Sequence, residues 1–121
     1  MHLIYHSIVG IGGSVFFGPS FFIGSILPDT ALVRNELRLR KSGKKFDSYT
    51  VYRVDFHLYH FTHSLWFPIM IGLFFPACAI GILTHQAMDW FSHSGPFSTR
   101  PLFPFMEISI EEMLRKCIKK Q

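Results

Sequence analysis

The chain of 121 residues contains seven histidines, and the most informative of them belong to one short pattern. His85, Asp89 and His93 follow one another at intervals of four residues. On a helix this spacing places the three side chains on one face. Imidazole nitrogens and carboxylate oxygens are ligands of zinc and related divalent ions, so the pattern predicts a metal-binding face. The structural alternative is a polar contact in which Asp89 accepts a hydrogen bond from either histidine.

A second group of histidines lies just before an apolar stretch. Asp55, Tyr59 and His63 follow at helical spacing and share one face, whereas His57 and His60 lie on an adjacent face. Two faces of a helix cannot both supply one metal ion. We therefore select His63 as a ligand, with Asp55 as a further ligand or as the group that orients it. His57 and His60 are interpreted as interfacial side chains.

His6 and Asp29 are ionisable residues in the otherwise uncharged beginning of the chain, and His2, nearer the terminus, is a poorer alternative to His6. An ionisable group that is buried without a partner costs free energy, and shared coordination of a metal ion would remove this cost. The structural alternative for Asp29 is to cap the helix that follows it. The candidate metal ligands are therefore His6, Asp29, His63, His85, Asp89 and His93.

Two apolar stretches must position these residues. Residues 7–27 and 64–84 each contain 21 residues without a formal charge, which is long enough for a transmembrane helix. Helix-breaking residues interrupt both stretches near the middle, Gly18 and Pro19 in the first and Pro76 in the second. Each stretch is therefore either a kinked span or a helical hairpin.

The two architectures make opposite predictions about the candidate ligands. A straight helix would hold His63 and His85 roughly 33 Å apart, whereas a hairpin that folds back near Pro76 would bring them together. In the same way, His6 and Asp29 meet only if the first stretch folds back. The arms of such hairpins are too short to cross a bilayer. A shared metal site therefore predicts a bundle of broken apolar helices that dips into or lies on a membrane.

The remaining segments also favour helices, so we expect a single all-α domain over residues 1–121. Residues 30–41 are predicted to form one helix, residues 42–45 a turn, and a further helix starts at about residue 48. In the tail, Ser109 and Glu112 have the spacing of a capping box, followed by apolar residues at helical spacing. Residues 106–121 are therefore predicted to form a C-terminal amphipathic helix.

The charges are concentrated outside the apolar stretches, although the formal net charge is only +4. Basic clusters beside long apolar stretches favour an anionic membrane surface as the partner. Binding to nucleic acid is disfavoured, because the aromatic residues lie mostly in the uncharged stretches rather than among the basic ones. The basic block that is expected to contact membrane lipids consists of Arg34, Arg38, Arg40, Lys41, Lys44 and Lys45.

The order of several short motifs resembles that of a known family. The chain carries Leu-Pro-Asp at residues 27–29, Tyr-His-Phe-Thr-His-Ser-Leu at 59–65, Leu-Thr-His-Gln-Ala-Met-Asp-Trp-Phe-Ser-His-Ser at 83–94 and Pro-Leu-Phe-Pro-Phe at 101–105. Over residues 6–105 it is similar to the YdjM-type predicted metal-dependent hydrolases. These are small, apolar bacterial and archaeal proteins described as membrane-bound, with distant similarity to zinc-dependent phospholipase C domains.

The resemblance implies a helical domain that holds a divalent metal with His and Asp residues and hydrolyses a phosphoester. It also implies a location at the bacterial or archaeal cytoplasmic membrane. The same six candidate ligands match the family by position. Two departures are evident, because Thr30 and Ala31 stand where many members have a second acidic residue after the Pro-Asp pair, and His60 stands where many have an arginine. The first weakens a two-metal interpretation, and the second weakens stabilisation of an oxyanion at that position.

The leading hypothesis is a membrane-associated, metal-dependent hydrolase of phosphoesters such as lipid head groups. Zinc is the expected cofactor and manganese the alternative, because either ion activates water and polarises a phosphoryl oxygen. The candidate catalytic residues are His63, as a ligand, and Asp29, as a ligand or as the base that accepts a proton from water. The alternative is a non-enzymatic protein with two membrane spans that binds a partner through its basic loop. In both cases the basic loop is expected in the cytoplasm.

Overall fold

The computed structural model describes residues 2–44, 52–93, 97–106 and 108–118. Within these residues the chain forms helices joined by short connections, which confirms the predicted all-α class. In chain order the elements are α1 (His2–Phe17), α2 (Pro19–Ile26), the short 3-10 helix η1 (Leu27–Asp29), α3 (Thr30–Lys41), α4 (Arg53–Thr62), α5 (Trp66–Gly72), α6 (Pro76–Ser92) and α7 (Ile110–Ile118).

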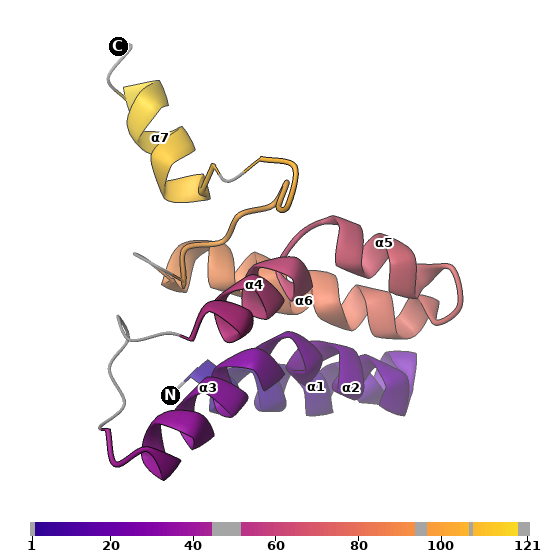
Figure 1. The fold of residues 1–121 in the computed structure, drawn as a ribbon. Coiled ribbons are helices and arrows are strands. Elements are labelled where there is room, and N and C mark those ends of the chain that lie inside the picture. The colour runs from indigo at the N-terminus through magenta and orange to yellow at the C-terminus, as the bar shows by residue number, and fades with distance from the viewer. Residues whose placement is uncertain (1, 45–51, 94–96, 107, 119–121) are drawn as a thin grey trace.

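The helices form two layers (Figure 1). One layer contains α1, α2 and α3, and the other contains α4, α5 and α6, while α7 lies apart at the end of the chain. The layers meet where α2 packs against α6 and where α3 packs against α4. Segments that are far apart in the sequence therefore face each other across the boundary between the layers.

The first apolar stretch folds back on itself at the predicted position. Gly18 ends α1 with a φ of 82°, a left-handed conformation that side-chain-bearing residues rarely adopt. Pro19 occupies the first turn of α2, where its missing N–H leaves no hydrogen bond unmade. As a result α1 and α2 pack against each other as a hairpin.

The second apolar stretch also forms a hairpin, between α5 and α6, with Pro76 in the first turn of α6. Neither stretch forms one straight helix, because each is divided between two helices. No helix formed by the described residues is both long enough and apolar enough to cross a bilayer. Binding of a partner through the basic loop stays a prediction.

The helix predicted to run from about residue 48 into the second stretch is interrupted. Residue 48 lies outside the described residues, and α4 ends at Thr62. Pro68 explains the interruption, because it cannot donate a hydrogen bond to the carbonyl of Ser64 four residues earlier. The side-chain amide of Gln86 donates to this Ser64 carbonyl at 3.0 Å and to the Thr62 carbonyl at 3.1 Å. The segment that carries His63 is thereby fixed to α6.

Glycine allows α2 and α6 to approach closely. A Cβ atom at Gly24 would overlap the Cys78 carbonyl oxygen, and one at Gly81 would overlap the Phe21 carbonyl oxygen. Further along the same contact, His85 Nδ1 lies 2.7 Å from the Ser25 carbonyl oxygen. The close approach of the two backbones therefore brings a candidate ligand of α6 onto α2.

The C-terminal helix starts as predicted. The backbone N–H of Ser109 donates to the Glu112 carboxylate at 3.1 Å, and the backbone N–H of Glu112 donates to Ser109 Oγ at 3.2 Å. These reciprocal bonds form a capping box. The described helix, α7, covers residues 110–118, whereas residues 107 and 119–121 of the predicted range 106–121 lie outside the described residues.

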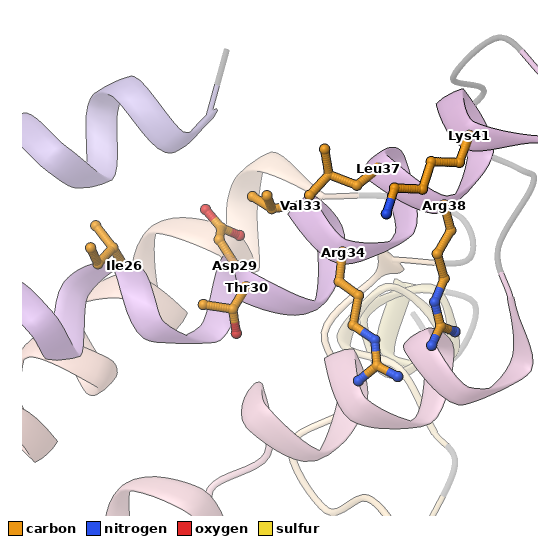
Figure 2. A pocket seen from close by; sticks show the side chains of 8 residues that line it. All are labelled: Ile26, Asp29, Thr30, Val33, Arg34, Leu37, Arg38 and Lys41. Carbon is orange, nitrogen blue, oxygen red and sulfur yellow. The ribbon is translucent and has the colours of Figure 1, made fainter.

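A cleft follows one face of η1 and α3 (Figure 2). Its volume is about 560 Å³. The lining residues are Ile26, Asp29, Thr30, Val33, Arg34, Leu37, Arg38 and Lys41. The cleft thus combines apolar side chains, three residues of the basic block and one candidate metal ligand.

The other described members of the basic block lie outside this lining. Arg40 pairs with Glu36 four residues earlier on α3. Lys44 follows the end of α3 and is exposed, whereas Lys45 lies outside the described residues.

Candidate metal centre

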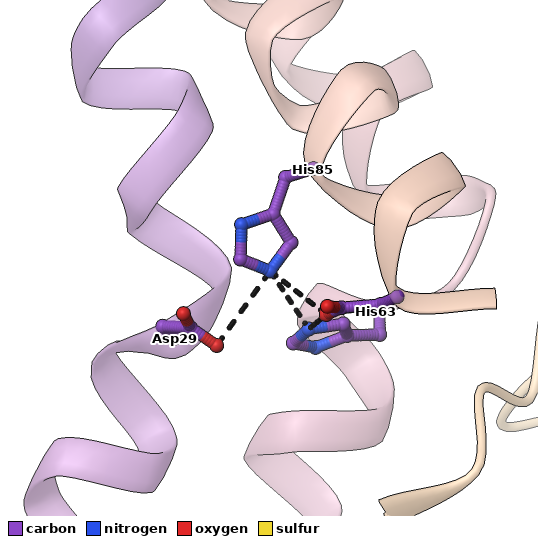
Figure 3. A group of neighbouring side chains, drawn as sticks. Asp29, His63 and His85 are labelled. Atoms are coloured by element: carbon purple, nitrogen blue, oxygen red, sulfur yellow. Dashed lines mark hydrogen bonds and ion pairs between the residues drawn. The ribbon is translucent and has the colours of Figure 1, made fainter. Parts of the chain in front are cut away.

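Four candidate ligands meet in the interior of the bundle. Asp29, His63, His85 and Asp89 each place one ligand atom within 4.8 Å of those of the other three, and all four residues are buried. Asp29 comes from η1, His63 from the residue after α4, and the other two from α6. Figure 3 shows the His85 ring pointing into the space between Asp29 and His63. The α5–α6 hairpin is needed for this arrangement, because it brings His85 and Asp89 back to His63.

The shortest distances in the cluster join the two histidines to Asp89. His63 Nε2 lies 2.9 Å and His85 Nε2 3.0 Å from Asp89 Oδ2. The two Nε2 atoms are 3.2 Å apart. Asp29 Oδ1 is more distant, at 3.6 Å from His85 Nε2. The group is therefore a tight trio with a looser fourth member.

Backbone carbonyls determine which nitrogen of each ring points into the cluster. His63 Nδ1 lies 2.8 Å from the Tyr59 carbonyl, and His85 Nδ1 lies 2.7 Å from the Ser25 carbonyl. A carbonyl oxygen only accepts hydrogen bonds, so each Nδ1 carries a proton and donates it. In the neutral imidazole the Nε2 atom then bears a lone pair. Two such lone pairs beside two carboxylates form a set of donors whose charge a divalent ion would balance.

Asp29 occupies the N-cap position of α3, yet its side chain makes no capping hydrogen bond. Within the part of the chain that the structure describes, its buried Oδ1 atom accepts no hydrogen bond at all. A buried carboxylate oxygen without a partner is costly. A cation beside His85 would satisfy it, so the donor set of two imidazole nitrogens and two carboxylate oxygens fits zinc or manganese.

His6 and His93 contact the other oxygen of Asp89. His6 Nε2 lies 3.0 Å and His93 Nε2 3.3 Å from Asp89 Oδ1. The His6 ring also stacks on the His85 ring, with a centroid distance of 3.8 Å. His6 thus meets the cluster through Asp89 and His85. Neither residue belongs to the group of four, and direct coordination by either one stays a prediction.

Burial and hydrogen bonding act in opposite directions on the titratable groups of the cluster. Burial would raise the pKa of Asp89, but hydrogen bonds from His6, His63 and other histidines outweigh it and hold that pKa below its ordinary value. Burial lowers the pKa of His63, which favours the neutral, ligating form. For His85, burial also acts to lower the pKa, but the hydrogen bond and charge of Asp89 prevail and raise it. The cluster thus keeps the buried carboxylate of Asp89 ionised.

Two residues that support the cluster were not identified as such from the sequence. The Tyr59 ring stacks on His63 at a centroid distance of 3.9 Å, and its hydroxyl donates to the Phe97 carbonyl. Burial and the nearby carboxylates raise the pKa of Tyr59 well above its ordinary value, so it stays a neutral phenol. Gln86 anchors the segment around His63. The only sequence signal was position, because Tyr59 precedes His63 by one turn and Gln86 follows His85.

The remaining histidines and Asp55 lie elsewhere. Asp55 is buried against α3, where it pairs with Arg34 and Arg38, so its predicted role at the metal is not supported. His60 is buried among aromatic rings that include Phe56, rather than interfacial. His57 is exposed, as the interfacial interpretation requires.

Comparisons with protein-family models, curated proteins and solved structures return no match for this chain. The resemblance to YdjM-type proteins therefore stays a prediction. That the cluster could hold a metal ion follows from its geometry alone, in which four potential ligand atoms from three segments of the chain converge.

Proposed function

We propose that this protein is a metal-dependent hydrolase that acts on phosphoesters. The observation that carries the proposal is the convergence of two imidazole nitrogens and two carboxylate oxygens in a buried centre. Both Nδ1 atoms are bound to backbone carbonyls, which leaves both Nε2 atoms facing carboxylates, as ligation of a shared ion requires. A zinc or manganese ion held by these residues would supply a Lewis acid that activates water and polarises the phosphoryl oxygen.

The uneven distances suggest a division of roles within the cluster. His63, His85 and Asp89 form the tight trio, and a catalytic zinc site has three protein ligands and one open position. Asp29 stands further away and also lines the cleft along α3, so it faces the side from which a substrate enters. In this proposal Asp29 accepts a proton from the attacking water. The water oxygen bonds to phosphorus, the ester bond breaks, and the proton passes to the leaving oxygen.

The first experiment measures metal content and phosphoester hydrolysis of the wild-type protein and of Asp29→Asn. Elemental mass spectrometry on protein purified in mild detergent is expected to find close to one equivalent of zinc or manganese. Hydrolysis of bis(p-nitrophenyl) phosphate should depend on this ion and be lost on treatment with a chelator. Asp29→Asn should keep the ion and lose about 10²–10⁴-fold in rate, because general bases contribute rates of this order.

Glu36→Gln is the matched control for Asp29→Asn, because it also neutralises an acidic residue near the basic block but lies outside the centre and pairs with Arg40. It should change neither metal content nor rate. Absence of metal from the wild-type protein, even after reconstitution, would contradict the proposal. Loss of the ion in Asp29→Asn would instead make Asp29 the fourth ligand of a closed, structural site.

We further propose that the protein acts at a membrane surface, which it contacts with the two hairpin tips, residues 15–17 and 73–75. Their side chains are apolar and exposed, and the exposed fraction reaches 84% for Phe16 and 78% for Phe74. The apolar stretches that contain the tips have no formal charge. Large exposed apolar patches on such a surface mark contact with a membrane or a protein.

Both tips lie at the same end of the bundle. Helices α2 and α6 start with Pro19 and Pro76, immediately after the tips, and run side by side towards the metal centre. His85 lies about 14 Å along α6 from Pro76. Interfacial elements typically enter a membrane by about 5–10 Å, so the centre would then stand near the lipid head groups. This placement supports head groups as substrates.

Flotation with vesicles of phosphatidylcholine and phosphatidylglycerol tests the membrane contact. The substitutions Phe16→Ser and Phe74→Ser should each weaken binding about tenfold or more, because burying a phenylalanine contributes about 1.5–3 kcal/mol. The matched control is Phe91→Ser, since Phe91 is even more exposed, at 90%, but lies at the opposite end of α6. Equal losses in all three variants, or none in the tip variants, would contradict the contact.

A further inference from the structure

The cleft along η1 and α3 shares one residue with the candidate metal centre. Asp29 belongs both to the buried cluster and to the lining of this cleft. From Asp29 to Lys41 the lining extends over twelve residues, or about 18 Å along a helix. The cleft is therefore long enough to hold more of a ligand than the group that would react at the centre.

The lining has an apolar part and a basic part. Ile26, Val33 and Leu37 provide the apolar surface, and Figure 2 shows Val33 and Leu37 on the opposite side of α3 from the guanidinium groups of the two arginines. Val33 and Leu37 are exposed although they are large and apolar. An elongated cleft with this division fits a ligand that has one apolar part and one charged part.

A buried carboxylate holds the two arginines of the cleft in place. Arg34 Nε lies 3.1 Å from Asp55 Oδ1, and Arg38 donates to Asp55 Oδ2 at 3.2 Å. Asp55 is almost completely buried on α4, whereas the arginine side chains remain 45% and 40% exposed. Each guanidinium has five N–H donors, so donors remain for a ligand after the bond to Asp55 is made.

The basic wall of the cleft, formed by Arg34, Arg38 and Lys41, carries a net positive charge. The two guanidiniums carry one positive charge more than the carboxylate they share, and Lys41 adds another. Arginine held in one orientation is well suited to bind the oxygens of a phosphate, because little conformational freedom is lost on binding. The wall therefore matches a phosphate group in both charge and hydrogen-bonding geometry.

We propose that this cleft selects phosphate esters that carry an apolar chain, with the phosphate bound by the α3 cations and the chain lying along Ile26, Val33 and Leu37. The inference rests on the proposed function in so far as Asp29 links the cleft to the hydrolytic centre. It adds the residues that would distinguish an amphiphilic phosphate ester from a polar one, because polar phosphate esters such as sugar phosphates gain nothing from the apolar side of the cleft.

Binding to the metal-free protein tests this substrate class independently of catalysis. We would titrate protein treated with a chelator with butyl phosphate, methyl phosphate and glycerol phosphate, by isothermal titration calorimetry. Butyl phosphate is expected to bind about tenfold more tightly than the other two, because its additional methylene groups leave water. Equal affinities for the three compounds would overturn the proposal, as would the absence of binding.

Variants of α3 show which part of the cleft binds the phosphate and which part binds the apolar chain. Lys41→Gln should weaken binding of all three compounds severalfold, whereas Leu37→Ser should remove only the advantage of butyl phosphate. Arg40→Gln is the matched control, because it removes a neighbouring positive charge from outside the lining. An equal loss in Lys41→Gln and Arg40→Gln would overturn the proposal, since only the overall charge would then matter.

The outcomes also separate this proposal from the hydrolase itself. If the wild-type protein holds no metal but prefers butyl phosphate, the hydrolase proposal fails and the cleft proposal stands. If metal-dependent hydrolysis is found without any preference for butyl phosphate, the cleft proposal fails alone.

Discussion

Replacement of His85 by alanine is expected to abolish stoichiometric metal binding. His85 Nε2 stands between Asp89 and Asp29, and its ring is fixed by the Ser25 carbonyl on one side and by the stacked His6 ring on the other. Loss of a residue that only orients a ligand typically costs 10–100-fold in metal affinity. Loss of a ligand itself should cost more, so we expect a decrease of at least about 100-fold.

The measurement combines elemental mass spectrometry with thermal unfolding followed by circular dichroism. An ion that binds only the folded state raises the unfolding temperature, so zinc should stabilise the wild-type protein and not His85→Ala. Asp89→Asn should behave in the same way, because the neutral amide cannot balance the charge of the ion. His57→Ala is the control, since His57 is exposed and outside the cluster. Full zinc content in both cluster variants would refute the site.

The second large effect is expected at a glycine rather than at a ligand. Gly24→Ala places a methyl group where the Cys78 carbonyl oxygen lies, and backbone atoms cannot move aside as a flexible side chain can. Overpacking of this kind costs about 1–3 kcal/mol of the free energy of unfolding, which outweighs the gain of up to about 1 kcal/mol from alanine in a helix. Separation of α2 from α6 would also withdraw the Ser25 carbonyl from His85 and weaken metal binding.

Gly12→Ala is the matched control, because a Cβ atom at Gly12 in α1 meets no atom within 4 Å. This substitution should raise the free energy of unfolding by about 0.5–1 kcal/mol through helix propensity alone and leave zinc affinity unchanged. Chemical denaturation and zinc titration of the two variants give the comparison. A Gly24→Ala protein as stable as Gly12→Ala would show that the helices are not in close contact.

Local signals in the sequence determined much of the helical architecture. Pro19 and Pro76 mark the first turns of α2 and α6, and Gly18 supplies the left-handed residue that the first hairpin requires. The bounds of α3 and the capping box at Ser109 were also predicted, because caps and helix breakers act within a few residues. The break before α5 was missed, although Pro68 is its cause.

The members of the metal cluster could be proposed from residue type and spacing, because His and Asp stand out in uncharged stretches. Their division into four converging ligands and two further histidines was decided by tertiary structure. Spacing places His85, Asp89 and His93 on one face, but only packing against η1 and α4 decides which atoms of that face meet Asp29 and His63. The same holds for Asp55, whose spacing from His63 suggested the metal and whose actual partners are arginines of α3. Sequence periodicity determines the face on which a side chain lies, whereas its partner is determined by the helix that packs against that face.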